Sequence, residues 1–530
     1  MQNPISKTSA PDSRLPTPDS RSACETPSSQ PPLPSPTANC QLPTANWLCL
    51  LLLLSSCAKT PPRPAPQVEV PVPQSWQSAL LPEGEVQSEW WTSFGDSQLD
   101  RIIAEALNRN YDLTAAAARL QAAEAQARIS GAGQLPSADA SLDGSRRRQN
   151  FVGFPIPGSG SRVLTTNSTN LGVSFNISWE ADVWGRIRDG AQASWADVQT
   201  SRAELQGLRQ SLAAQTAKAW FALAEIRQQM ELAQSTLESY QSSAERIRRR
   251  YEQGLLPPLD LRLALSNIHT TQAQLERRRD ELQRARRQLE IILGRYPRSE
   301  LENSSDMPEL PPTPPGGVPS ELLNRRPDLV AAEWRLAAAD ARFNEARKAF
   351  YPRLNLSGGT GTAGQGLGDL VDPGLFVWNL ASSLLQPVFQ GGRLRAGADL
   401  SQAQIRQAVA DFASTLLQAF SEVEAALAAE GILARNESEL GELVEQNQAA
   451  LRLAEDQYHT GLQNYITVLE AQRRTLVSRT QLISLRRRRL ENRIDLHLAL
   501  AGGFEVGSSG ITAEGAERGD AQDGEKREEL

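Results

Sequence analysis

The chain has 530 residues, of which 40% are hydrophobic and 22% are charged. This composition excludes global disorder, because the chain holds enough apolar side chains to bury a core. The formal net charge of −7 gives no support to nucleic-acid binding.

Residues 1–56 are predicted to be a signal peptide with an atypical Pro/Ser/Thr-rich N-terminal extension. Its apolar stretch, residues 47–56, is far shorter than the roughly 20 residues that cross a bilayer as a helix. Leu54-Ser55-Ser56-Cys57 then has the pattern of a bacterial lipobox. We therefore predict cleavage before Cys57 and a covalent lipid on that residue as the only attached group. A free cysteine beside an apolar run is the alternative.

Residues 57–89 are rich in proline and are predicted to be a lipid-anchored tether. The remaining cysteines, Cys24, Cys40 and Cys49, precede the predicted cleavage, so the mature chain has no pair that forms a disulfide. Residues 503–530 carry eight acidic and three basic side chains and are predicted to be a disordered acidic tail.

The body between these ends is predicted to be a tandem repeat. Two Tyr-x-x-Gly turns, which begin at Tyr251 and Tyr458, lie 207 residues apart. The pairs Leu135-Pro136 and Tyr351-Pro352 lie 216 residues apart. We assign the first repeat to 90–294, a linker to 295–319 and the second repeat to 320–502.

Each repeat is predicted to hold three helices and two strands. A helix of about 35 residues (97–132; 320–349) precedes the strands, and a helix of roughly 65 residues follows them. At 1.5 Å per residue, the long helix reaches on the order of 100 Å. A third helix (258–293; 464–500) runs back after each Tyr-x-x-Gly turn.

Four predicted strands alternate apolar and polar residues, at 138–144, 171–180, 353–357 and 376–384. Such strands suit a half-buried soluble sheet or a membrane barrel with a polar lumen. The lipobox favours the barrel. Because four strands cannot close around a lumen, the pattern predicts an oligomer.

With these features the chain resembles the outer membrane efflux protein family, the TolC-like channels, and within it the lipoprotein branch of OprM and NodT-type factors. The motifs that carry the resemblance are Phe94-Gly95-Asp96, Asn110-Tyr111-Asp112-Leu113, Arg326-Pro327-Asp328-Leu329, Glu422-Val423-Glu424 and the two Tyr-x-x-Gly turns.

The resemblance implies a mainly α protein with a small membrane β-barrel. Three copies would form a 12-stranded barrel in the outer membrane of a Gram-negative bacterium and an α-helical tunnel in the periplasm, with the linker 295–319 in an equatorial belt. The implied function is the exit duct of a tripartite RND-type efflux pump, which passively conducts substrates from a periplasmic adaptor and an inner-membrane pump. The implied partners are outer-membrane lipid, the adaptor and the pump.

The resemblance also implies roles for residues at the tips of the helical hairpins. The turns would dock the adaptor protein through Tyr251, Gly254, Leu255, Tyr458, Gly461 and Leu462. Where relatives often carry acidic gate residues, this chain reads Ala449-Ala450-Leu451-Arg452, with Glu455 and Asp456 nearer the turn. Arg452 inverts the local charge or pairs with one of these two acids.

No functional site is assigned to the other motifs. Gly359-x-Gly361-x-x-Gly364 is taken as a flexible extracellular hairpin loop. The three histidines, His269, His459 and His497, lack partners at metal-ligand spacing, and no catalytic motif is found, so neither a metal site nor an enzyme is predicted. The arginine runs at 246–250 and 486–489 are taken as solvated or interhelical faces.

Two other functions remain open. One is the outer-membrane duct of a type I protein secretion system, and the other is a non-conducting, lipid-tethered periplasmic coiled-coil scaffold. A recording of ion conductance in a planar bilayer separates a pore from a scaffold.

Overall fold

The computed structural model describes residues 73–78, 87, 89–152, 164–302, 306–315 and 319–500, all within the unit Arg63–Leu530. The predicted signal peptide, Cys57 and the acidic tail lie outside the described residues.

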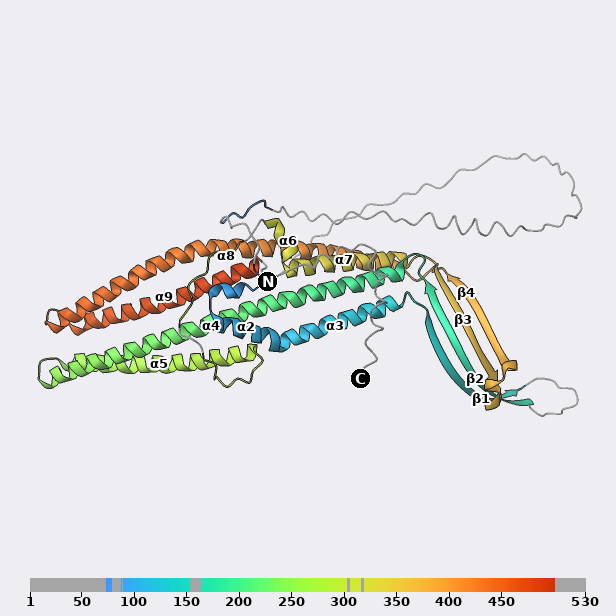
Figure 1. Cartoon of the computed structure of the whole chain (residues 1–530), viewed down its shortest axis with the longest axis horizontal. Coiled ribbons are helices and arrows are strands. Elements are labelled where there is room, and N and C mark those ends of the chain that lie inside the picture. Colours follow the sequence, from blue (N-terminus) through green and yellow to red (C-terminus); the bar gives the residue numbers. More distant parts are fainter. Residues whose placement is uncertain are drawn as a thin grey trace, which may run out of the picture. The chain divides into compact units, whose positions relative to one another are not determined.

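The described part of the chain contains the same unit twice (Figure 1). Each unit has one helix, then a pair of strands, then two long helices that form a hairpin. The first copy consists of α3 (Tyr111–Ala132), β1 (Ser137–Phe151), β2 (Leu164–Ala181), α4 (Arg186–Glu252) and α5 (Pro258–Ile292). The second consists of α7 (Pro327–Lys348), β3 (Arg353–Gly364), β4 (Phe376–Leu385), α8 (Arg393–His459) and α9 (Tyr465–Ala499). Shorter elements are η1 (Trp90–Phe94), α2 (Ser97–Arg109), η2 (Pro319–Glu321), α6 (Leu322–Arg325), η3 (Leu367–Val371) and η4 (Pro373–Leu375).

The helix lengths confirm the predicted tandem repeat. Helices α4 and α8 each have 67 residues and begin 207 residues apart (393 − 186). Helices α5 and α9 each have 35 residues and keep the same offset (465 − 258). Helices α3 and α7 each have 22 residues and begin 216 residues apart (327 − 111).

The prediction of unbroken helices over 97–132 and 320–349 is wrong. The first breaks at Asn110, whose backbone is extended (φ −66°, ψ 130°). The Asn110 side chain accepts hydrogen bonds from the amides of Asp112 (2.9 Å) and Leu113 (3.1 Å), so it caps a new helix, α3. The second breaks at Arg326, before Pro327, because the residue before a proline disfavours the helical conformation.

Asn110 and Arg326 are equivalent residues of the two repeats, and both tie a break to the end of a distant helix. Asn110 Nδ2 donates a hydrogen bond to the carbonyl oxygen of Ile292 at 2.9 Å, in the last turn of α5. Arg326 Nη1 donates to the carbonyl oxygen of Ala499 at 3.2 Å, at the same position in α9. These bonds satisfy carbonyl groups that a helix end leaves without partners.

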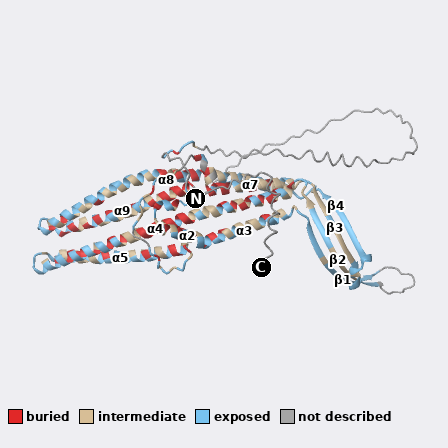
Figure 2. Cartoon of the chain, viewed as in Figure 1, coloured by how far each residue is buried: buried red, intermediate tan, exposed pale blue. Residues whose placement is uncertain are grey.

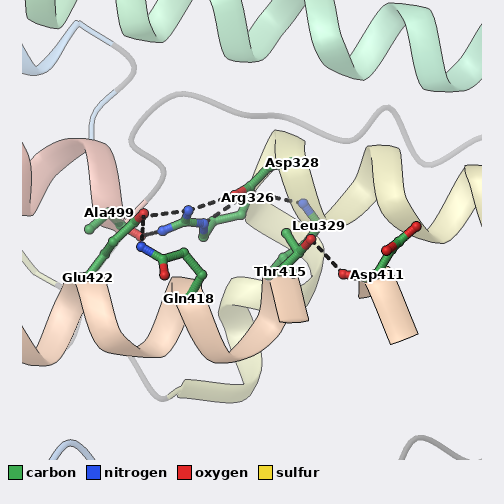
Figure 3. Close-up of polar contacts among 8 residues, drawn as sticks. All are labelled: Arg326, Asp328, Leu329, Asp411, Thr415, Gln418, Glu422 and Ala499. Atoms are coloured by element: carbon green, nitrogen blue, oxygen red, sulfur yellow. Dashed lines mark hydrogen bonds and ion pairs between the residues drawn. The ribbon is translucent and has the colours of Figure 1, made fainter. Parts of the chain in front are cut away.

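Arg326 also joins α7 to α8 (Figure 3). Its guanidinium donates to both carboxylate oxygens of Asp328, at 3.0 and 2.7 Å, and to Glu422 at 2.8 Å. Gln418 donates to the other Glu422 oxygen at 3.1 Å. Burial on its own lowers the pKa of the Arg326 guanidinium, but the bonds and charges of Asp328 and Glu422 outweigh it and raise that pKa.

Helix α4 is the central helix, which packs against α3 and α7 along one part of its length and against α5 and α9 along the other. Buried side chains line the facing sides of the helices (Figure 2). The largest buried cluster is centred on large side chains from η1, α2, α4 and α5. Its bulkiest members are Trp90, Phe94, Leu99, Trp220, Phe221 and Leu289.

Two flanking segments pack on these clusters. Leu301 is buried in the first cluster, and Met307 and Leu310 pack against it, so the described part of the linker lies on the helices. Trp76 is buried in a second cluster with Phe420 of α8. In the described part of the chain, no helix is both long enough and apolar enough to cross a membrane.

The four strands form one antiparallel sheet in the order β1-β2-β3-β4. The strands are longer than predicted, since β1 runs to Phe151 instead of 144 and β3 to Gly364 instead of 357. In both cases the alternation of apolar and polar residues ends before the backbone pairing does.

The pairing register places most of the large apolar residues of the four strands on one face, while Phe151, Val377 and Leu385 lie on the other. Phe175 lies opposite Ala140 on β1 and Thr360 on β3, and Thr360 lies opposite Trp378 on β4. Most of the large apolar side chains of this face are exposed in the single chain, and Leu171, Leu354 and Leu356 are half-buried. Figure 2 shows the sheet as exposed and intermediate residues. We call this surface the apolar face; it includes Leu142, Val173, Phe175, Ile177, Trp378 and Leu380.

The interpretation of Gly359-x-Gly361-x-x-Gly364 as a hairpin loop is wrong, because all three glycines lie within β3. A Cβ atom at Gly361 would lie 2.3 Å from the carbonyl oxygen of Val173. A Cβ atom at Gly359 would lie 2.6 Å from the Asn379 Oδ1 atom and 2.8 Å from the Asn176 Oδ1 atom. These glycines permit the close approach of neighbouring strands and side chains on the polar face.

The two long hairpins turn at Gly254 and Gly461, which have φ values of +74° and +79°. The amide of Leu255 donates to the carbonyl of Arg250 at 2.9 Å, and the amide of Leu462 donates to that of Gln457 at 2.8 Å. Both turns thus end a helix with the same left-handed glycine motif. Helix α5 begins at Pro258. Asn464 precedes α9, and its side chain caps that helix by accepting the Thr467 amide at 3.1 Å.

We expect Arg326→Ala to lower the free energy of unfolding by about 2 kcal/mol, because three acceptors lose a charged donor. Arg326→Lys should lower the free energy of unfolding by an intermediate amount, since an ammonium keeps the charge but lacks the planar set of donors of the guanidinium. The control is Arg335→Ala, which removes an ion pair with Glu204 between two exposed side chains. The control should change the stability by less than about 1 kcal/mol. Thermal unfolding followed by circular dichroism measures both, and equal effects would contradict the assigned role.

We expect Gly254→Ala and Gly461→Ala each to destabilise its hairpin by about 1 kcal/mol, because an alanine is strained at positive φ. No atom lies within 4 Å of the added Cβ at either position, so the effect isolates the backbone. Gly441→Ala, inside α8 and equally open, should instead stabilise the chain by about 0.5–1 kcal/mol. Hydrogen exchange of the tip amides measures the first two, and an effect of the same sign at all three positions would refute this account.

Candidate functional site

The tips of the two helical hairpins form the candidate site, and they pack on each other through a small apolar cluster. This tip cluster draws buried residues from all four helices: Ala244, Ile247, Ala264, Ala454, Tyr458, Tyr465 and Val468. Because the two hairpins share one apolar cluster, the burial of its side chains holds them together.

The two turn tyrosines, predicted as equivalent, lie in different environments. Tyr458 is 8% exposed, and its hydroxyl donates a hydrogen bond to Asp260 Oδ2 at 3.3 Å. Tyr251 is 38% exposed. The Tyr458–Asp260 bond joins α8 of the second hairpin to α5 of the first.

The environment of Tyr458 keeps its hydroxyl protonated. Burial first, and then the negative charge and hydrogen bond of Asp260, raises the pKa of Tyr458 to about 12. The guanidinium carbon of Arg250 lies 6.0 Å from the centroid of the Tyr458 ring, at the limit of a cation–π contact. The hydroxyl is therefore a hydrogen-bond donor throughout the neutral pH range.

Asp260 was not singled out from the sequence. The only signal for it is its place in the first turn of α5, where an acid is favoured in any helix. Its contact with Tyr458 spans 198 residues of sequence and depends on how the hairpins pack.

The three predicted gate residues lie close together in α8 but differ in their contacts. Arg452 is exposed and forms no ion pair with Glu455, Asp456 or any other residue that the structure describes. Glu455 is half-buried and accepts a hydrogen bond from Gln472 of α9 at 3.5 Å. The backbone carbonyl of Asp456 accepts the amide of Thr460 at 3.1 Å. Of the two alternatives for Arg452, an ion pair with Glu455 or Asp456 is absent from the described part of the single chain, and inversion of the local charge stays a prediction.

A cavity of about 260 Å³ lies beside the tip cluster, between the two hairpins. Its lining combines aliphatic and aromatic side chains with basic side chains and one acid, among them Ile247, Tyr458 and Tyr465 with Arg246, Arg250 and Glu455. This space marks a place where the hairpins are incompletely packed against each other.

The outermost residues of the turns are apolar and exposed. Leu255 is 63% exposed and Leu462 is 76% exposed. Exposed leucines at the end of a helical hairpin suit contact with another protein. The assignment of the turns as adaptor-docking residues stays a prediction.

The histidines lie apart from one another. Within the described ranges, no three His, Cys, Asp or Glu side chains are grouped as a metal ion would require. His497 is buried and stacks on Trp90, with ring centroids 5.5 Å apart. Burial, and then the charge of Arg493, lowers the pKa of His497 to about 4, so its ring is neutral at pH 7.

The second arginine run forms ion pairs between helices, as predicted. Arg486 and Arg489 of α9 contact Glu437 of α8 at 3.1 and 2.6 Å. These contacts hold α9 against α8.

The sequence model of the outer membrane efflux protein family matches residues 102–295 and 318–502. The chain is 33% identical over 471 residues to the pyoverdine export outer membrane protein OpmQ of Pseudomonas putida, with 87% of this chain and 98% of OpmQ covered. It is 32% identical over 478 residues to the outer membrane protein OprJ of Pseudomonas aeruginosa, with 88% and 97% covered.

Among solved structures, that of the outer-membrane channel OprN is similar at a TM-score of 0.76 and 26% identity, with 83% of this chain and 98% of OprN covered. The matches confirm the predicted TolC-like fold, the outer-membrane location and the role in efflux. The chain belongs to the outer membrane efflux protein family.

Proposed function

We propose that three copies of this chain form the exit duct of a tripartite RND-type efflux pump. The observation that carries the proposal is the four-stranded sheet, which has one continuous apolar face and two edge strands, β1 and β4. In a bilayer every backbone polar group requires a partner, so an open sheet is unstable there. Pairing β4 of one copy with β1 of the next closes a 12-stranded barrel.

The helices support the same assembly. Helix α8 packs chiefly against α7 and α9. Several of its apolar residues are exposed in the single chain: Leu400, Leu417, Ile432, Leu443 and Leu453. A neighbouring copy would cover these residues of α8 and continue the wall of a tunnel.

Opening of the tip is the controlled step in this proposal. The tip cluster and the Tyr458–Asp260 bond hold the two hairpins of one copy together. An adaptor that docks at Leu255 and Leu462 would contact both hairpins and shift their packing. Arg452, Glu455 and Asp456 would then set the charge along the opening, with Arg452 free to meet a neighbouring copy or the cargo.

We also propose a passive duct without catalytic activity. Two observations support this part of the proposal: relatives of this chain are export and efflux proteins, and its sequence carries no nucleophile elbow. Cargo choice would then rest with the inner-membrane pump.

The lipid anchor at Cys57 is the last part of the proposal. The lipobox and the proline-rich tether that follows it support the anchor. Because the barrel itself would hold the trimer in the membrane, the lipid is auxiliary.

Planar-bilayer recording of the purified trimer tests the duct. We expect small, infrequent openings in the unaltered protein and an open probability at least about five-fold higher in Tyr458→Phe. The reason is that each copy loses one hydrogen bond, worth about 1 kcal/mol. Trimers that never conduct, even with this substitution, would leave the coiled-coil scaffold as the better explanation.

Tyr465→Phe is the matched control for Tyr458→Phe. The Tyr465 ring is buried in the same cluster, and its hydroxyl donates to no residue in the described ranges. The control should conduct like the unaltered protein. An equal increase in both variants would show that loss of a hydroxyl from the tip cluster, and not of the bond to Asp260 in particular, opens the tip.

Intact-mass measurement tests the anchor. We expect the mature chain to begin at a diacyl- or triacyl-modified Cys57, and Cys57→Ser to accumulate as unprocessed precursor. The mature chain delivered by another signal peptide should still form the conducting trimer. Any other mature N-terminus would refute the lipid at Cys57 without affecting the duct.

A further inference from the structure

The β1–β2 hairpin continues beyond the apolar part of the sheet. On the apolar face, Leu142 lies opposite Val173, and the next pair on that face is Gly144 with Leu171. Further along β2, that face carries only Thr169, Asn167 and Thr165, while backbone pairing continues to Phe151 and Leu164. The hairpin therefore has a polar extension on the same face.

Two arginines stand on this extension. Side chains alternate along a strand, so Arg146 and Arg148 lie on the face of Leu142, and Arg147 lies on the opposite face. Arg146 is paired across the strands with Thr169, and Arg148 with Asn167. Both arginines are exposed.

No acidic side chain neutralises this pair. The sequence from Gly144 to Trp179 contains no Asp or Glu. Asp143 is adjacent in sequence but lies on the opposite face, where it accepts a hydrogen bond from Ser141 at 3.0 Å. In the part of the chain that the structure describes, neither arginine forms an ion pair.

The height of the two arginines fits the polar layer of a membrane. They lie two and four residues beyond the Gly144–Leu171 pair. At about 3.3 Å per residue and a strand tilt of about 40°, their Cα atoms stand about 5 and 10 Å above that pair. The headgroup layer is about 5–8 Å thick on each side of the hydrocarbon core. Arg146 therefore stands within this layer, and Arg148 stands just beyond it, from where its long side chain can reach back to the phosphates.

We propose that Arg146 and Arg148 bind phosphate groups of lipopolysaccharide in the outer leaflet of the outer membrane. A guanidinium offers a planar fork that matches two phosphate oxygens, and neither arginine is paired with an acid in the described part of the chain, which leaves both charges available. Asp369 packs over Gly364 on the same face, but its carboxylate accepts the amides of Gln365 and Gly366. The proposal rests on the trimeric barrel proposed above, in which the helices are periplasmic. The strand ends opposite the helices then face the cell exterior, and a closed barrel carries three such pairs.

Binding of lipopolysaccharide to the purified, detergent-solubilised trimer tests this site. Native mass spectrometry should count fewer bound lipids on Arg146→Gln and Arg148→Gln, and the double variant should bind roughly ten-fold more weakly. Lipopolysaccharide from which the phosphates have been removed should bind the unaltered trimer as weakly as intact lipid binds the double variant.

Arg147→Gln is the matched control, because it removes one charge from the same strand on the opposite face. It should bind lipopolysaccharide like the unaltered trimer. The inference is overturned if Arg146→Gln and Arg148→Gln bind lipopolysaccharide as tightly as the unaltered trimer. It is also overturned if Arg147→Gln loses as much affinity for lipopolysaccharide as either of these variants.

Conductance of the same preparations separates this inference from the proposed function. If the Arg146→Gln and Arg148→Gln variants conduct normally but bind lipopolysaccharide poorly, the result supports both the duct and the lipid site. Variants that conduct and bind normally overturn only the lipid site. A chain that forms no conducting trimer overturns the duct, and the lipid site with it.

Discussion

Backbone hydrogen bonding inside a bilayer is the constraint on which the structure depends. Water is absent there, so each strand must find a partner along both edges. The four strands of one chain satisfy this internally for β2 and β3 and leave one edge of β1 and of β4 without a partner in the same chain. In the proposed trimer, the apolar face, the exposed residues of α8 and the tandem repeat then serve one requirement, because each copy would present matching edges to the next.

The junction between sheet and helices carries this arrangement from strands to helices. The indole of Trp179 donates to the carbonyl of Gln134 at 2.9 Å, and that of Trp184 donates to the carbonyl of Pro352 at 2.8 Å. Asp182 caps the start of α4 by accepting the amides of Ile187 (3.1 Å) and Arg188 (2.8 Å). Strand direction and helix direction are thereby fixed together at the rim of the sheet.

Sequence reasoning recovered the parts of the fold that local chemistry determines. The ends of α5 and α9 follow from glycine and capping residues at a constant offset, and they were predicted to within one residue. Helices α4 and α8, predicted at roughly 65 residues, have 67 each. The break at Asn110 was missed because helical periodicity continues through it and the capping bonds replace only one turn. The extension of β1 was missed because Arg146 and its neighbours end the apolar alternation, although pairing with β2 continues. At the tip, the turns were predicted but the Tyr458–Asp260 bond was not, since it depends on packing between the repeats.

The equal length of α4 and α8 restricts how this chain can change during evolution. One residue inserted into α4 lengthens it by about 1.5 Å and rotates everything beyond it by about 100°. The inserted residue would misalign the tip cluster unless α5 gained a residue too, and the two hairpins would still end at different levels unless α8 and α9 gained theirs. Equal lengths in both halves are the mark of a duplicated unit, and in the proposed trimer a change in the depth of the tunnel would need four coordinated insertions.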